Sequence, residues 1–408
     1  MSVKLSDKAT QQIDQLLADY PQADYPGTVI GAINKAGELL YLKATGLKNI
    51  DTKEKYETDT LFWVASFSKL VTAVGAMQLV EQGKIGLDDP VGKVLPELAN
   101  PEVIVSTTPE ETKTRPAKVP ITYRMLLSHT SGLGYPFWNQ DILHWAGQAG
   151  QASWFTNVKH PLVFEPGTSW EYSVGLDWMA VAMERITGLT LDEYSKEYIF
   201  DPLGMVDSTF NLASRPDLQP RLATLHTWDA ASGKTSTMEF AHNPLGVSGK
   251  EQQSGGAGLH STPTDYLRLL QVLLNDGENE KGVHILKTET VKTMFEDQLA
   301  NIENKGALGD SAPPTTMPAF AHTPLVIAPG LAKGWGLSFL LNKDDWPGNR
   351  KSHTAEWAGI ACLSWVADPK SEVAFVIFNE IIPYCQPKFI ETMTKLQGII
   401  YADGALVK

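Results

Sequence analysis

The clearest chemical signal in this sequence is a serine and a lysine three residues apart, at the start of an apolar helical pattern. Ser66 and Lys69 lie in WVASFSKLVTAVGAMQLVEQG, where apolar residues recur at helical spacing until Gly83, a residue type that ends helices. An oxyanion on a serine in the first helical turn is stabilised by free backbone N–H groups and by the helix dipole. Lys69 lies one turn on, on the same face, where a partly desolvated amine can take the serine proton.

Taken alone, this segment favours a simpler interpretation. A single Ser-x-x-Lys is a weak motif, and Ser66 as a helix cap with a solvated Lys69 carries more weight. A nucleophile needs a second proton-handling group, and Tyr172 is the best candidate. Tyr172 lies in EPGTSWEYSVGLDWMA, a Pro/Gly-rich loop that precedes a predicted helix. The alternative for Tyr172 is an ordinary core tyrosine.

Two further segments are interpreted as scaffold. ITYRMLLSHTSGLGY predicts a helix that ends near His129, which we expect to be a structural hydrogen-bonding residue. SGGAGLHSTPTDYLRLLQVLLNDG, residues 254–277, predicts a glycine-rich entry into a long helix. The glycines match neither of the common phosphate-loop patterns, so a phosphate site receives little weight.

The elements that must position these residues come from both ends of the chain. Apolar residues at helical spacing predict a helix over residues 6–19 and a final helix over residues 388–401. Apolar runs on either side of turn residues predict hairpins around residues 35–37 and 368–371, and a further strand over residues 334–342. Strands and helices at both termini predict one antiparallel sheet of the α+β class.

The middle of the chain has a different pattern. Helical segments separated by long loops predict a mostly helical lobe over residues 89–249, inserted into a discontinuous sheet domain of residues 1–88 and 250–408. We expect the active site to lie between the two. Residues 300–331 are rich in Pro, Gly and Ala, and a loop of that length is usually functional or disordered.

Composition and charge exclude several classes of function. The 408 residues are 43% hydrophobic and 20% charged, which is typical of a globular protein, and the net charge of -13 argues against nucleic acid or an anionic membrane as partner. Only two cysteines occur, Cys362 and Cys385, without metal-ligand spacing, so we expect no disulfide scaffold and no metal site. The N-terminus lacks the pattern of a signal peptide and no apolar run could span a membrane, which predicts a cytoplasmic protein. No pattern in the sequence indicates the oligomeric state.

Four segments together resemble the class C β-lactamase and penicillin-binding-protein superfamily of serine hydrolases. ASFSKLVTAVGAMQLVEQGKIGLDDPVGKVLPEL, ITYRMLLSHTSGL, FEPGTSWEYS and SGGAGLHST occur in the family's order, and the resemblance covers residues 25–380. It implies a sheet domain with an inserted helical lobe. It also implies that Ser66, Lys69 and Tyr172 are the catalytic residues, in the roles of the family's S-x-x-K and Y-x-N motifs.

The sequence departs from the β-lactamase pattern at two motifs. Val174 stands where the Y-x-N motif has Asn, and no K-T-G occurs. Trp357-Ala358-Gly359, twelve residues before Pro369, instead resembles the W-G-G motif of family VIII carboxylesterases. Segments around residues 129–138 and 170–194 also resemble the fungal acyltransferases that attach the statin side chain. An alternative alignment matches His353-Thr354-Ala355 to the H-T-G of related peptidases, which would place His353 at the pocket.

The resemblance implies a mechanism without metal or organic cofactor. Ser66 attacks an ester carbonyl, Lys69 carries most of the base role, and Tyr172 relays the proton to the leaving alkoxide. The oxyanion would be held by the backbone N–H groups of Ser66 and Ile360. Trp357, Ala358 and Gly359 would line the site. Aromatic residues of the helical lobe would form an apolar acyl pocket, or would equally well fill the core of that lobe; they are Tyr135, Phe137, Trp138 and Trp154.

Three functions follow from these residues. The leading hypothesis is a serine carboxylesterase that acts on small-molecule esters through an acyl-Ser66 intermediate and passes the acyl group to water or to an alcohol. The second is a β-lactamase or D-amino-acid-type carboxypeptidase that tolerates the altered third motif. The third is a catalytically inactive homologue that serves as a binding protein.

Overall fold

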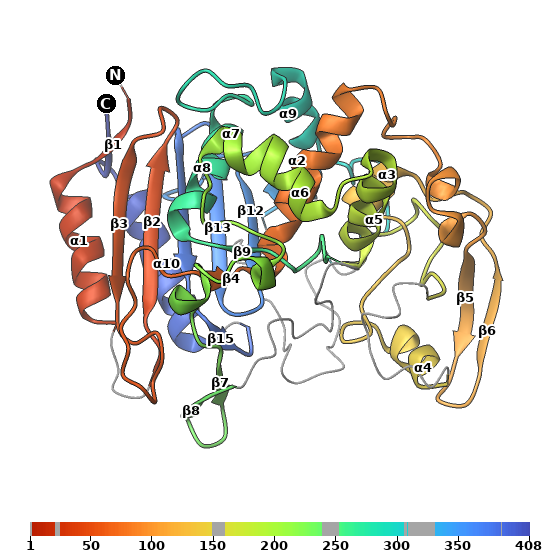
Figure 1. The fold of residues 1–408 in the computed structure, drawn as a ribbon, viewed down its shortest axis with the longest axis horizontal. Coiled ribbons are helices and arrows are strands. Elements are labelled where there is room, and N and C mark those ends of the chain that lie inside the picture. Colours follow the sequence, from red (N-terminus) through yellow and green to blue (C-terminus); the bar gives the residue numbers. More distant parts are fainter. Residues whose placement is uncertain are drawn as a thin grey trace.

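A seven-stranded antiparallel sheet, in the order β10-β11-β12-β13-β14-β2-β3, is the centre of this computed structural model (Figure 1). The structure describes residues 2–20, 25–148, 160–238, 253–305, 308, 331–384 and 386–408. Strands from both ends of the chain meet where β14 pairs with β2, which confirms the predicted α+β class. The strands are β2 (Thr28–Asn34), β3 (Leu39–Thr45), β10 (Lys333–Trp335), β11 (Leu340–Asn342), β12 (Ala355–Gly359), β13 (Leu363–Asp368) and β14 (Val373–Phe378).

Helices cover both faces of this sheet, and β2 shows why. All of β2 is buried, and its side chains alternate between two apolar clusters. Ile30 and Ala32 pack with the terminal helices α1 (Asp7–Ala18) and α10 (Pro387–Ile400). Val29 and Ile33 face the other cluster, which includes α2 (Ser68–Glu81) and α8 (Pro263–Leu274).

Several predicted elements are confirmed at their expected positions. Both hairpins form, with their turns between β2 and β3 and between β13 and β14. Helices α1 and α10 match the predicted terminal helices, and Gly83, with a φ of 67°, follows the end of α2. The single strand predicted over residues 334–342 is wrong. The chain reverses at Ser338, whose φ is 82°, so this segment forms β10 and β11 as an antiparallel pair.

The middle of the chain contains more strand than predicted. Besides α3 (Tyr123–Leu127), α4 (Gln140–Gln148) and α5 (Gly175–Thr187), it forms an antiparallel pair, β5 (Glu102–Thr107) with β6 (Thr112–Pro116). This hairpin was not predicted because most residues of β5 and β6 are polar, and all but one are exposed or half-buried. Figure 1 shows these elements together on the side of the molecule away from the two termini.

Part of the predicted helical lobe, residues 226–237, pairs with a strand from the C-terminal part of the chain. The strand β7 (His226–Asp229) forms a hairpin with β8 (Lys234–Thr237) and pairs in parallel with β15 (Ile381–Ile382). The division into residues 1–88 with 250–408 and residues 89–249 stays a prediction, and these pairs favour an earlier second boundary.

The other elements are β1 (Lys4–Leu5), β4 (Phe62–Trp63), β9 (His260–Ser261), β16 (Leu406–Val407), α6 (Leu191–Ser195), α7 (Asp201–Leu203) and α9 (Thr288–Met294), with short helical turns η1 (Ala65–Phe67), η2 (Val91–Lys93), η3 (Pro96–Leu98), η4 (Lys196–Phe200), η5 (Leu212–Ser214) and η6 (Gln219–Arg221).

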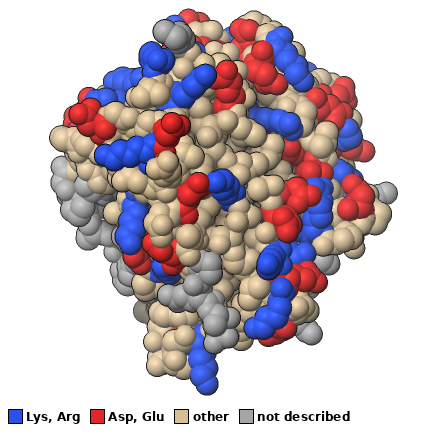
Figure 2. Space-filling view, turned by 90° about the vertical axis from the view of Figure 1, so that its left-hand side faces the viewer, with Lys and Arg blue, Asp and Glu red and all other residues tan. Residues whose placement is uncertain are grey.

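Charges of both signs are mixed on the face drawn in Figure 2, which lies on the side of α1 and β3. In the described parts of the chain, no helix is both long and apolar enough to cross a membrane, and no three His, Cys, Asp or Glu side chains could together hold a metal ion. Cys362 is buried, and its thiol donates to the carbonyl oxygen of Pro383 at 3.6 Å. Cys385 and nearly all of the predicted 300–331 loop beyond residue 305 lie outside the described residues.

Candidate active site

Ser66 is placed by a sharp turn between β4 and α2. Ala65 adopts a φ of 45°, in the left-handed region that costs energy for a residue with a side chain. The turn continues as η1 and then as α2, so that Ser66 lies at the helix entry and is half-buried. The sequence prediction of a serine in the first turn is therefore correct in position, and local strain at such a turn is typical of functional sites.

Lys69 is held beside Ser66 by two hydrogen bonds. Its Nζ lies 3.3 Å from Ser66 Oγ and donates to the carbonyl oxygen of Gly256 at 2.8 Å. The side chain is 1% exposed, which contradicts the alternative of a solvated lysine. Gly256 packs closely against Asp177, because a Cβ there would lie 2.5 Å from Asp177 Oδ2 and the carboxylate would have to shift. The glycine-rich SGGAG segment thus packs against the lysine and does not form a phosphate loop.

Burial and one nearby carboxylate set the charge of Lys69. Desolvation lowers the pKa of Lys69 to about 7, and Asp177 partly opposes this decrease. Asp177 is buried on α5, where its Oδ1 accepts hydrogen bonds from Ser254 Oγ and from the N–H of Gly256. Asp177 was not predicted as a site residue. Its signal was an acidic residue in the first turn of an otherwise apolar helix.

We expect kcat/KM to rise with pH through about 7, because the uncharged form of Lys69 is the base and its fraction increases as the proton leaves. Asp177→Asn should move this rise to lower pH. The substitution removes the charge that raises the Lys69 pKa, while an amide oxygen can still accept both hydrogen bonds. Steady-state kinetics over a pH series of both proteins measure the midpoint. An unchanged or higher midpoint in the variant would contradict this assignment.

Tyr172 lies over the lysine, in the loop that leads into α5. Its Oη accepts a hydrogen bond from Trp357 Nε1 at 3.0 Å, and its ring centroid is 4.6 Å from Lys69 Nζ. Burial raises the pKa of Tyr172 well above its ordinary value, and hydrogen bonds with Ser66 and Trp357 offset only part of that rise. Tyr172 is therefore a protonated phenol in the resting site, better suited to giving a proton than to taking one.

The end of β12 lies against the turn that carries Ser66. Gly359 approaches so closely that a Cβ would lie 2.9 Å from the carbonyl oxygen of Val64. Among the described residues, the backbone N–H groups of Ser66 and Ile360 donate to no protein acceptor. Two free donors of this kind are what an oxyanion hole requires, and their role here stays a prediction.

Aromatic side chains surround Tyr172. The rings of Tyr135 and Trp138 lie 5.4 Å and 5.0 Å from it, measured between centroids, and Phe137 stacks on Tyr135 at 4.7 Å. Trp154 lies outside the described residues. Two further tryptophans, Trp170 and Trp335, were missed. Trp170 lies in the predicted Tyr172 loop, where only the tyrosine was considered, and Trp335 comes from a segment interpreted as a strand. Their rings lie 4.9 Å apart, and Trp335 also contacts Trp357.

The structure does not bring His353 to this group. Its side chain is exposed. Its backbone N–H, in the connection between β11 and β12, donates to the carbonyl oxygen of Asn342 at the end of β11. No described contact joins the His353 side chain to Ser66, Lys69 or Tyr172. Ala358 is half-buried between Trp357 and Gly359 on β12.

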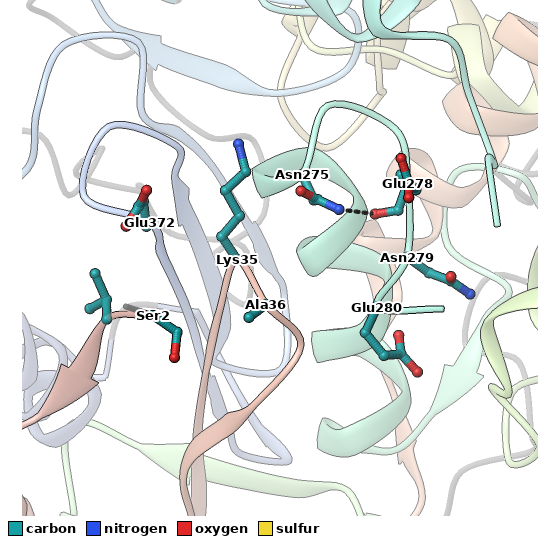
Figure 3. A pocket seen from close by; sticks show the side chains of 9 residues that line it. Ser2, Lys35, Ala36, Asn275, Glu278, Asn279, Glu280 and Glu372 are labelled. Carbon is teal, nitrogen blue, oxygen red and sulfur yellow. Dashed lines mark hydrogen bonds between the residues drawn. The ribbon is translucent and has the colours of Figure 1, made fainter. Parts of the chain in front are cut away.

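A separate hollow of about 450 Å³ lies at the turn between β2 and β3 and the C-terminal end of α8 (Figure 3). Its lining includes Lys35 and the acidic residues Glu278, Glu280 and Glu372. None of the predicted site residues lines it.

Comparisons with known proteins agree with the fold. The sequence model of the beta-lactamase family matches residues 11–379. The lovastatin esterase of Penicillium rubens is 34% identical over 366 residues, which cover 86% of this chain and 87% of that protein. The monacolin J acid methylbutanoyltransferase of Aspergillus terreus is 29% identical over 393 residues, which cover 93% and 92%. A variant of simvastatin synthase (LovD) from Aspergillus terreus superimposes with a TM-score of 0.84, at 27% identity over 98% of both chains.

The chain therefore belongs to the beta-lactamase family. The prediction of a β-lactamase-like serine hydrolase or acyl-transferring enzyme is confirmed at that level, because the similar proteins are an esterase and acyltransferases. The roles of the individual residues remain predictions.

Proposed function

We propose that this protein is a carboxylesterase that forms an acyl-enzyme on Ser66 and passes the acyl group to water or to an alcohol. The observation that supports this most directly is the contact between Lys69 Nζ and Ser66 Oγ, made by an amine whose pKa burial lowers to about 7. An uncharged amine beside a serine hydroxyl is an effective base near neutral pH.

The proton movements balance across the two half-reactions. As Ser66 Oγ attacks the carbonyl carbon, its proton passes to Lys69, and the oxyanion is stabilised by the backbone N–H groups of Ser66 and Ile360. Collapse of the tetrahedral intermediate breaks the bond to the alkoxide. Tyr172 donates its proton to that alkoxide and is reprotonated from Lys69. In the second half-reaction, water or an alcohol attacks the acyl-enzyme, and the same groups act in reverse order.

Neutral esters suit this site better than substrates with a carboxylate. Trp357 stands where the family has the lysine of its third motif, and it gives Tyr172 an uncharged N–H donor. The rings of Tyr135 and Trp138 beside Tyr172 supply an apolar wall. A β-lactamase or carboxypeptidase would use the third-motif lysine as a second cation beside Lys69, and Trp357 does not supply that charge. The names of the similar proteins, an esterase and a methylbutanoyltransferase, also favour an ester.

We expect purified protein to hydrolyse short-chain aryl esters with a kcat/KM far above that for a cephalosporin. The physical reason is that no lysine occupies the third motif to bind the carboxylate of a β-lactam. Steady-state kinetics with a series of nitrophenyl esters and a chromogenic cephalosporin measure both values on the same preparation. Comparable efficiencies on the two substrates would reject the ester assignment in favour of a β-lactamase.

A further inference from the structure

His129 lies at the end of α3 in an unusual backbone conformation. Its φ is 60°, in the left-handed region, and its side chain is completely buried. Histidine tolerates this conformation better than most residues, but its side chain is not needed merely to end a helix, where glycine or asparagine usually serves. A buried histidine in a costly conformation therefore calls for a reason in the surrounding contacts.

Those contacts lie on both sides of Tyr172. The N–H of Glu171 donates to the carbonyl oxygen of His129 at 3.0 Å, and the N–H of Ser173 donates to His129 Nδ1 at 3.2 Å. Ser173 Oγ lies 2.9 Å from the same Nδ1 and accepts from the N–H of Gly175 at 3.2 Å. One residue thus holds the backbone before and after the tyrosine, and through Ser173 it also holds the first residue of α5. We call these four hydrogen bonds the His129 clamp.

The imidazole ring itself lies against the tyrosine. The ring centroids of His129 and Tyr172 are 4.8 Å apart, and the ring centroid of Trp335 lies 5.4 Å from that of His129. The hydrogen bond from the Ser173 N–H to Nδ1 assigns the proton of the neutral ring to Nε2, which is buried without a partner among the described residues. Burial and the nearby Lys69 charge lower the pKa of His129 well below its usual value, so the ring keeps this acceptor at all ordinary pH values.

We propose that His129 is a positioning residue that fixes the Tyr172 hydroxyl at Ser66 through the clamp on Glu171 and Ser173. The inference rests on the proposed function, in which Tyr172 moves the proton. The Tyr172 segment is a loop, and rotation of its backbone would carry the phenol away from both Ser66 and Trp357. The His129 Nδ1 atom prevents this by holding Ser173, whereas an apolar residue at this position would leave the Ser173 N–H without its acceptor.

Two substitutions separate the clamp from the bulk of the side chain. Asparagine places Oδ1 at the same number of bonds from Cα as His129 Nδ1 and tolerates a positive φ, whereas glutamine places its oxygen one bond further out. His129→Gln should lower kcat by up to about 100-fold, the scale of a misplaced catalytic group, with KM little changed. His129→Asn should keep most of the kcat. Thermal unfolding of both variants controls for stability, and Ser173→Ala removes the hydroxyl part of the clamp if the glutamine variant does not fold.

A double-mutant cycle distinguishes positioning from a general structural role. If His129 acts through Tyr172, His129→Gln should cost little further rate in a Tyr172→Phe background. An equal loss in both backgrounds, a normal kcat in His129→Gln, or no recovery in a folded His129→Asn protein would each overturn the proposal.

A measurement without substrate keeps the clamp separable from the proposed function. Hydrogen–deuterium exchange of a peptide spanning residues 168–176 should be faster in His129→Gln than in wild type or His129→Asn. Unchanged exchange would overturn the clamp even in an active enzyme. Conversely, if the wild type forms no acyl-enzyme with any ester, the proposed function fails, and the exchange comparison still decides whether His129 holds this loop.

Discussion

Ser66→Ala is expected to abolish ester hydrolysis, with a loss on the order of 10⁶-fold in kcat, the scale found when a nucleophilic serine is removed. The hydroxyl is half-buried at the entry of α2 and contacts Lys69 Nζ, and no other described serine has this contact. Intact-mass spectrometry after exposure to an aryl ester should show one added acyl group on the wild type and none on the variant.

Ser68→Ala is the matched control, since Ser68 lies two residues further along the same helix entry. Its hydroxyl donates to the carbonyl oxygen of Ala65 and accepts from the N–H of Leu259, so it serves the structure. That variant should lose stability, by about 1–3 kcal/mol for the unpaired backbone groups, and still form the acyl-enzyme. Ester hydrolysis that survives in Ser66→Ala would remove the serine from the mechanism.

The next largest effects are expected at Tyr172 and Lys69. Tyr172→Phe removes the proton donor and should lower kcat by about 10²–10⁴-fold, the usual contribution of a general acid–base group, with KM little changed. Lys69→Met keeps most of the buried volume but removes the base, so it should lose as much or more. Kinetics of both variants over a pH series should also show that the rise near pH 7 persists in Tyr172→Phe, because that rise belongs to Lys69.

Trp357→Phe is a useful comparison for the tyrosine. It keeps an aromatic ring but removes the N–H donor that lies 3.0 Å from Tyr172 Oη, so its loss should be smaller than that of Tyr172→Phe. Near-normal turnover in Tyr172→Phe would show that Lys69 moves the proton without the phenol. We do not expect His353 to move the proton in place of Tyr172, because its side chain is exposed.

Local sequence patterns were sufficient for the elements whose partners are near in the chain. The helical spacing after Ser66 correctly placed α2 and set Lys69 one turn beyond the serine, and the turns at residues 35–37 and 368–371 correctly placed two hairpins. The strand predicted over residues 334–342 failed because a continuous apolar run does not reveal a reversal at Ser338. The hairpin of β5 and β6 was missed because its residues are mostly polar.

The sequence by itself determined the class of protein, through motifs whose order and spacing are a family property, and it predicted Ser66, Lys69 and Tyr172 as the catalytic residues. Only the tertiary structure decided that these side chains meet and which groups surround them. The low pKa of Lys69 depends on burial beneath the Gly256 segment, 187 residues away, and the hydrogen bond to Tyr172 comes from Trp357, 185 residues away. Helical and strand periodicity specifies neighbours within a few residues, whereas desolvation and charge at a site depend on which distant segments the sheet register brings together.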